Sequence, residues 1–326
     1  MSALDSSVET FGQRAEDLVT VLKTVLLGQD EVITQSVTGL FAGGHLLLEG
    51  VPGLGKTRLV RALANALELS YSRIQFTPDL MPADITGTMI LREDDSGRRV
   101  FAFRQGPIFG NLVLADEINR ATPKTQSALL EAMQEGTVTA GGETRALPAP
   151  FFVLATQNPL EMEGTYPLPE AQLDRFLLKV LVPYPAHEVL RDIGRQQGDE
   201  LPSVPLVMDG DQIAAMAAVA GQVPVATPVI DYAIALVLAT RPETTDVAEV
   251  KRYVRAGASQ RGLQALVGTS RLRALLNGRY NVSIDDIRAM ARPALRHRLI
   301  LSFEGQSEGV SADAVLDTLL DAVPAP

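Results

Sequence analysis

The chain has 326 residues, of which 46% are hydrophobic, 21% charged and 5% aromatic, which suffices for one large or two ordinary globular domains and excludes disorder as the main state. It contains no cysteine, so disulfides, thiolate metal sites and thiol nucleophiles are excluded and a reducing compartment is the simplest home. The net charge of −10 argues against nucleic acid as a partner, and no apolar run reaches the length of a signal sequence or membrane span. These features predict a soluble, cytoplasmic protein.

The first half of the chain alternates between helical and strand-like segments. Apolar residues recur with a helical period over residues 11–28 and 29–41, ahead of an apolar run at 45–49, a glycine-rich stretch at 50–57 and a helical segment at 58–69. Four further short apolar runs occupy residues 71–76, 111–116, 151–156 and 176–181, with a helix at 124–134. Short buried strands alternating with helices predict an α/β fold with a doubly wound parallel sheet, covered on both faces.

Two stretches interrupt this rhythm, and a third region lacks strand signals. Residues 88–103 and 137–147 each place a turn between strand-like arms, which predicts two inserted β-hairpins. Beyond residue 185 the pattern predicts only helices, at 211–220, 228–240, 259–276, 283–291 and 310–323. Ser283 and Asp286 form a capping-box pair, and Gly278 stands where a helix should end. We therefore expect a core over residues 1–184 and an all-helical domain over residues 185–326.

The glycine-rich stretch has the spacing of a phosphate-binding loop, Gly-x4-Gly-Lys-Thr, between a predicted strand and a predicted helix. In such a loop the glycines let backbone N–H groups curl round the phosphates, Lys56 reaches the β and γ phosphates, and the Thr57 hydroxyl coordinates Mg²⁺ at a helix N-terminus. The expected nucleotide-binding residues are Gly50, Val51, Pro52, Gly53, Leu54, Gly55, Lys56, Thr57 and Arg58.

A second motif follows at the end of the predicted strand 111–116. Asp116 would hold the Mg²⁺ shell, and Glu117 would orient and deprotonate the attacking water. Asn158 follows the strand 151–156 and could contact the γ-phosphate or the water, although an Asn before a proline is also a common turn residue. The Asn-Lys-x-Asp guanine reader of a GTPase does not occur in the sequence. The two motifs together therefore predict a nucleoside triphosphatase other than a GTPase.

Longer strings resemble the AAA+ ATPases and, within them, the MoxR group. They are GVPGLGKT at 50–57, LADEINRA at 114–121, PKTQSALLEAMQE at 123–135, ATQNP at 155–159 and YPLPEAQLDRF at 166–176. The resemblance covers nearly the whole chain. It implies a P-loop AAA+ core of the helix-2-insert branch, whose two hairpins would project toward a substrate or partner, and a helical lid domain after it. As an alternative, either hairpin could be a local extension of the sheet.

The resemblance also implies roles for single residues. Asn158 corresponds to sensor 1, and Arg175 to the arginine finger that completes the site of a neighbouring subunit. Arg261 corresponds to the sensor 2 arginine turned toward the γ-phosphate, although the residue before it is not the proline of the family pattern. Gly28 and Gln29 match the segment that lines the adenine pocket.

The implied activity is Mg²⁺-dependent ATP hydrolysis by a homo-oligomeric ring, expected to be a hexamer, with ATP and Mg²⁺ as cofactors. Such a ring would remodel client proteins like a chaperone or insert a cofactor or metal into them, together with a partner of the von Willebrand factor A type. The motor subunit of a metal-chelatase-like complex is the nearest alternative. A nucleic-acid remodelling ATPase is disfavoured by the acidic charge, and a non-hydrolysing scaffold would be expected to lack Glu117 or Arg175.

Overall fold

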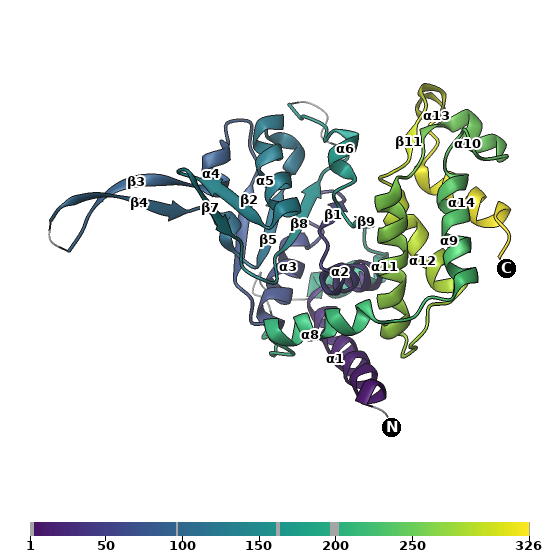
Figure 1. The fold of residues 1–326 in the computed structure, drawn as a ribbon, viewed down its shortest axis with the longest axis horizontal. Helices are drawn as coiled ribbons and strands as arrows, with labels where there is room; N and C mark the ends of the chain where they lie inside the picture. The colour runs from purple at the N-terminus through teal and green to yellow at the C-terminus, as the bar shows by residue number, and fades with distance from the viewer. Residues whose placement is uncertain (1–2, 96, 161–163, 196–201, 326) are drawn as a thin grey trace.

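The structure is a computed structural model that describes residues 3–95, 97–160, 164–195 and 202–325. At its centre, five parallel strands form one sheet in the order β2-β5-β8-β1-β9 (Figure 1). The strands are β1 Leu46–Glu49, β2 Tyr71–Gln75, β5 Leu112–Asp116, β8 Phe152–Gln157 and β9 Leu178–Leu181. Each lies within one of the predicted apolar runs or extends it by one residue, so the predicted parallel sheet is confirmed.

The sheet is buried on both faces, because side chains alternate between two hydrophobic clusters along each strand. Leu46 and Leu48 join a cluster with α1, α2 and α3, whereas Leu47 joins a second cluster with α4 and α5. These helices are α1 Ala3–Val25, α2 Asp30–Phe41, α3 Lys56–Ala66, α4 Pro82–Thr86 and α5 Pro123–Glu135. Two 3-10 turns, η1 Pro107–Phe109 and η2 Ile118–Arg120, flank β5.

Both predicted hairpins are present, and neither extends the central sheet. The first consists of β3 Gly87–Glu93 and β4 Arg99–Gln105, and the second of β6 Thr137–Ala140 and β7 Glu143–Ala146. The first hairpin projects far from the body of the molecule (Figure 1). Its base contacts the second hairpin, since the Arg145 guanidinium lies 4.2 Å from the centre of the Phe103 ring.

The C-terminal region is helical, with one correction to the all-helical prediction. Two short strands, β10 Val254–Ala256 and β11 Ile300–Leu301, form an antiparallel pair. Runs of two or three residues are too short to show a periodic pattern, which is why they were not predicted. The helices that follow Pro169 are α6 Glu170–Leu173, α7 His187–Arg195, α8 Gly210–Gly221, α9 Thr227–Ala239, α10 Ala248–Tyr253, α11 Gln260–Leu276, α12 Ile284–Leu295, α13 Phe303–Ser307 and α14 Ala312–Ala322.

The predicted helix signals near residue 280 are confirmed. The Ser283 side chain accepts a hydrogen bond from the Asp286 N–H, and the Asp286 carboxylate accepts one from the Ser283 N–H at 2.9 Å. Gly278 follows α11 with φ of +67°. This left-handed conformation costs a glycine little, so Gly278 ends the helix as the sequence predicts.

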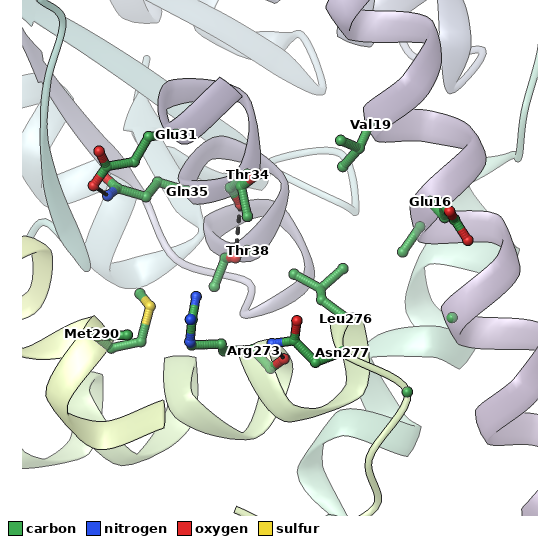
Figure 2. Close-up of a pocket in the computed structure, with 14 residues that line it drawn as sticks. Glu16, Val19, Glu31, Thr34, Gln35, Thr38, Arg273, Leu276, Asn277 and Met290 are labelled. Atoms are coloured by element: carbon green, nitrogen blue, oxygen red, sulfur yellow. Dashed lines mark hydrogen bonds between the residues drawn. The ribbon is translucent and has the colours of Figure 1, made fainter. Parts of the chain in front are cut away.

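The hydrophobic core continues across the proposed boundary near residue 185. Buried residues of α8, α11 and α12 belong to the same cluster as the β1 leucines. A cavity of about 690 Å³ lies where α1, α2, α11 and α12 meet, with the Arg273 side chain reaching from α11 toward α2 (Figure 2). The N-terminal helices are thus packed against the C-terminal helices, and the two-domain division stays a proposal.

Within the described part of the chain, no helix has the length and apolar character that crossing a membrane requires.

Candidate active site

The phosphate-loop sequence connects β1 to α3 and lines a cavity of about 370 Å³. Gly55 caps α3 with φ of +80°, and a Cβ there would lie 2.6 Å from Leu26 Cδ1, so the turn requires glycine. Lys56 and Thr57 open the helix, whose first-turn N–H groups have no intrahelical partner. The residues lining the cavity are Pro52, Gly53, Gly55, Lys56, Thr57, Arg58, Arg73, Gln75, Asp116, Glu117, Thr156 and Asn158.

Lys56 is held inside its own loop, where its Nζ donates a hydrogen bond to the Gly50 carbonyl at 2.6 Å. Burial lowers the pKa of Lys56, and the negative charges of Asp116, Glu117 and Glu49 oppose that shift. Gly50 therefore contributes through its carbonyl and, like Val51 and Leu54, is not among the residues that line the cavity. Lys56 thus lines the same cavity as the carboxylates of Asp116 and Glu117.

Asp116 ends β5 at the carboxyl edge of the sheet, where open α/β sheets bind their ligands. Its Oδ1 accepts a hydrogen bond from Thr156 Oγ1 at 2.7 Å, and its Oδ2 pairs with Arg73 Nη2 at 2.7 Å. Thr156 lies on β8 and Arg73 on β2, the two strands beside β5. Neighbouring strands thus fix the carboxylate from both sides, and its Oδ2 faces the Arg73 guanidinium.

Glu117 adopts a left-handed backbone conformation with φ of 57°, which costs a non-glycine residue about 1 kcal/mol. Its N–H donates to Thr156 Oγ1 at 2.9 Å. Its Oε2 accepts hydrogen bonds from Gln75 Nε2 and Arg120 Nη1, both at 2.9 Å. Backbone strain, combined with a carboxylate that accepts two hydrogen bonds at a cavity, is typical of a functional residue.

Asn158 lies at the cavity wall and is also part of a turn. It follows β8, its side chain lines the phosphate cavity, and the residue is 6% exposed. Its Oδ1 also accepts a hydrogen bond from the Leu160 N–H at 3.1 Å, which is a turn interaction. The turn therefore fixes the side chain at the cavity wall.

A second, largely apolar cavity of about 280 Å³ adjoins the phosphate cavity and shares Pro52, Gly53, Gly55 and Arg58 with it. Gln29 lines this cavity, donates from Nε2 to the Pro183 carbonyl at 3.0 Å, and leaves its buried Oε1 without a hydrogen-bond partner in the described chain. The cavity is further lined by Val25, Leu26, Leu27, Leu54, Tyr184, Pro185, Leu190 and Ile193.

Gly28 lies next to Gln29 in the chain and packs against α7 near this second cavity. It does not line the cavity, and a Cβ at its position would lie 2.6 Å from Val189 Cγ2 of α7. Its φ of +67° also favours glycine. Gly28 thus allows α7 to pack closely against the segment that carries Gln29.

The two predicted arginines lie together, away from the phosphate loop of their own chain. Arg175 and Arg261 line one cavity of about 380 Å³, which shares no lining residue with the phosphate cavity among the residues described. Arg175 Nη1 donates to the Leu130 carbonyl at 2.8 Å. Arg261 therefore does not line the phosphate cavity of its own chain but lies beside Arg175.

The donors present fit a nucleotide bound with Mg²⁺. The Thr57 hydroxyl and an Asp116 carboxylate are the hard oxygen ligands that Mg²⁺ prefers, with phosphates and water completing its shell. No group of three or more His, Cys, Asp or Glu in the parts of the chain that are described could hold a metal alone. In the second cavity, Gln29 Oε1 has no hydrogen-bond partner among the described residues and can accept a hydrogen bond from an amino group. The buried Nε of Arg58, which lines both cavities, also has no partner in the described part of the chain.

Sequence reasoning missed Arg73, Gln75 and Thr156, although all three line the phosphate cavity. Each forms a hydrogen bond with Asp116 or Glu117 from a neighbouring strand. Because the order of the strands was not predictable from the sequence, neither were these contacts. The alternation of polar residues at Arg73 and Gln75 in β2 was the only available signal, and it is also the ordinary pattern of a strand near a sheet edge.

Comparison with known proteins agrees with this geometry. Residues 45–178 match the family described as ATPase family associated with various cellular activities (AAA), and residues 247–319 match the AAA lid domain. Chaperone MoxR1 of Mycobacterium tuberculosis is 42% identical over 306 residues, covering 94% of this chain and 80% of that protein. The uncharacterized protein YeaC of Bacillus subtilis is 44% identical over 308 residues, covering 94% of this chain and 92% of that protein.

A solved structure agrees as well. The crystal structure of a protein from Cytophaga hutchinsonii, described as a candidate ATPase, superposes with a TM-score of 0.91 at 38% identity, covering 98% of this chain and 97% of that one. The fold and the site thus define an AAA+ ATPase with a C-terminal lid. Within that class the chain belongs to the MoxR family of chaperone-like ATPases.

Proposed function

We propose that this ATPase works as a homo-oligomeric ring, built as a hexamer, in which each active site is shared between two neighbouring subunits. The observation that carries the proposal is the separation of Arg175 and Arg261 from the phosphate loop of their own chain. Arginines that complete a phosphoryl-transfer site can be supplied in trans. A head-to-tail ring would bring the arginine cavity of one subunit to the phosphate cavity of the next.

In the proposed site, one subunit binds the nucleotide and activates water. Gln29 and the apolar cavity receive the adenine, Lys56 contacts the β and γ phosphates, and Thr57 and Asp116 hold Mg²⁺, which would neutralise charge on the phosphates. Glu117 orients the water and accepts its proton, with Gln75 and Arg120 fixing the carboxylate. Asn158, at the end of β8, contacts the γ-phosphate or that water.

The neighbouring subunit supplies positive charge. Arg175 and Arg261 would stabilise the charge that develops on the transferred phosphoryl group, which is worth roughly 10³ to 10⁵ in turnover for an arginine finger. Arg175 would exchange its hydrogen bond to the Leu130 carbonyl for one to a phosphate oxygen. Because Leu130 is part of α5, which leads into the second hairpin, this exchange links hydrolysis to the hairpins.

The work of the ring would be remodelling of client proteins or insertion of a metal or cofactor, in the cytoplasm. The name of the relative Chaperone MoxR1 supports the chaperone-like part of this proposal. A partner of the von Willebrand factor A type is proposed from the family resemblance. The projecting hairpin, with exposed Leu91 and Phe101, offers a surface for a client or that partner (Figure 1).

Glu117→Gln tests the proposed chemistry. It keeps the phosphate loop and the Mg²⁺ ligands but removes the base, so ATP should bind with the parent affinity while hydrolysis falls by about 10²-fold or more. Calorimetry measures the affinity, phosphate release measures turnover, and mass photometry with and without ATP measures ring size. Glu131→Gln, on the exposed side of α5, is the control. Parent-like turnover of Glu117→Gln, or a monomer under all conditions, would contradict the proposal.

A further inference from the structure

The segment that carries Arg175, residues 174–177, lies between α6 and β9 and has no regular structure of its own. The residues that follow α12 hold it in place. The Arg298 side chain is 3% exposed, and its Nε pairs with Asp174 Oδ1 at 2.7 Å. Its two Nη groups donate to the carbonyls of Phe176 at 2.7 Å, Leu177 at 3.0 Å and Asp174 at 3.2 Å, and to that of Ala294. One guanidinium thus donates hydrogen bonds to three of the four carbonyls of residues 174–177, the segment that contains Arg175.

His297 adds a second contact to the same segment. Its Nε2 lies 3.0 Å from the Phe176 carbonyl, which can only accept, so Nε2 carries the proton. Arg296, at the same helix end, bonds elsewhere, to Asp313 Oδ1 at 2.9 Å and to the Lys179 carbonyl at 3.3 Å. The contacts to residues 174–177 are therefore specific to Arg298 and His297 among these three neighbours.

Asp174 connects the finger segment to the second arginine. Its Oδ2 accepts a hydrogen bond from Ser259 Oγ at 2.9 Å, while Oδ1 faces Arg298. Ser259 caps α11 by accepting from the N–H of Arg261 at 3.1 Å. The Asp174 carboxylate, next to Arg175 in the chain, is thus linked through Ser259 to the first turn of α11, which carries Arg261.

Burying an arginine–carboxylate pair costs desolvation that its attraction often fails to repay, so such a pair is weak evidence for stability and better explained by a geometric requirement. Arginine suits that requirement, because its rigid fork binds several oxygens at fixed directions. We infer that Asp174 and Arg298, assisted by His297, act as a positioning clamp that presents Arg175 and Arg261 together to the neighbouring subunit. This inference rests on the trans role of these arginines under the proposed function.

Mixed rings can test the clamp, because each variant damages one side of the shared site. Glu117→Gln leaves the arginine side intact, and Arg175→Ala leaves the phosphate side intact. Arg298→Gln and the milder Arg298→Lys would be assayed for ATP hydrolysis alone, with Glu117→Gln, and with Arg175→Ala, in mixed rings confirmed by native mass spectrometry. Arg296→Gln is the matched control, since it ends the same helix without contacting residues 174–177.

Arg298→Gln alone should lose turnover by about 10²-fold, the effect of a small misplacement of a catalytic group, while its ATP affinity stays at the parent value. Mixing with Glu117→Gln should restore activity as far as it does for Arg175→Ala, whereas mixing with Arg175→Ala should restore none. Arg298→Lys should show the same pattern with a smaller loss, and Arg296→Gln should hydrolyse ATP at nearly the parent rate.

Parent-like turnover of both Arg298 variants would overturn the inference. So would failure of both to recover with Glu117→Gln when Arg175→Ala does recover, because the damage would then lie in their own phosphate site or fold. If the Arg175→Ala reference mixture itself fails in confirmed mixed rings, the trans role is wrong and the clamp falls with it. The reference mixture thus separates failure of the clamp from failure of the proposed function.

Discussion

Lys56 shows how much of the site depends on a single side chain. It lies partly buried in its own loop, with Nζ bonded to the Gly50 carbonyl, and its charge is supported by Asp116, Glu117 and Glu49. A triphosphate in the cavity would offer stronger acceptors than a neutral carbonyl, because hydrogen bonds between charged groups are about twice as strong as neutral ones. Lys56 is therefore held at the wall of the cavity in which we propose that it binds the nucleotide.

Lys56→Met should weaken ATP binding by roughly 1.5–3 kcal/mol, the value of a hydrogen bond to a charged group. The methionine keeps most of the side-chain volume, so the fold should be retained. Calorimetric titration with Mg·ATP measures the loss, and Lys124→Met, an exposed lysine at the start of α5, is the control. Unchanged affinity of Lys56→Met would show that this loop is not the phosphate site.

Residues whose chemistry is fixed by type and spacing were predictable, and residues defined by a distant partner were not. Lys56, Thr57, Asp116 and Glu117 belong to the first group, since the motif itself states their chemistry. Arg298 belongs to the second group, because its role depends on Asp174, which lies 124 positions away in the chain.

At the scale of elements, the five strands and both hairpins followed from short apolar runs and turn residues. The predicted end of α12 at residue 291 was wrong, because the helix continues to Leu295 through the buried Pro293. Proline removes one helical N–H and normally predicts a break. The short pair β10–β11 and the placement of α11 beside Arg175 depend on tertiary packing and carry no local signal.

His45 joins three of these elements just before β1. Its Nδ1 accepts from the Val153 N–H of β8 at 3.1 Å, and its Nε2 donates to the Met133 carbonyl of α5 at 3.0 Å. Burial lowers the pKa of His45 from 6.5 to about 4. The folded protein therefore keeps this histidine neutral, whereas the unfolded chain binds a proton below its ordinary pKa.

This contribution to stability is complete above pH 6.5 and is lost as the pH falls toward 4. Between pH 7 and pH 5 it should lower the free energy of unfolding by about 2 kcal/mol. His45→Gln should flatten that part of the pH profile in urea unfolding, whatever its absolute stability. Buried His297, whose pKa is also lowered by burial, should preserve part of the slope.

His187→Gln, at an exposed position on α7, is the control for replacing a histidine: it leaves His45 and its contacts in place, so the slope that His45 contributes between pH 7 and pH 5 should persist. An identical slope for His45→Gln and the parent would show that His45 is protonated in the folded state as readily as in the unfolded one.

At the scale of the whole molecule, two cavities divide the groups that we propose act together in hydrolysis. The phosphate cavity holds Lys56, Asp116 and Glu117, while Arg175 and Arg261 line a separate cavity. In the proposed ring, one head-to-tail contact repeated by rotation would complete every site with the same interface.

Hydrolysis by mixtures of Glu117→Gln and Arg175→Ala, measured across mixing ratios, tests the shared site most directly. Both variants should be nearly inactive alone. In random head-to-tail rings, turnover per subunit should pass through a maximum at equal amounts, of about one quarter of the parent value, because about one interface in four then combines an intact phosphate side with an intact arginine side. A flat, inactive profile in rings that mass spectrometry shows to be mixed, or parent-like activity of Arg175→Ala alone, would contradict the account.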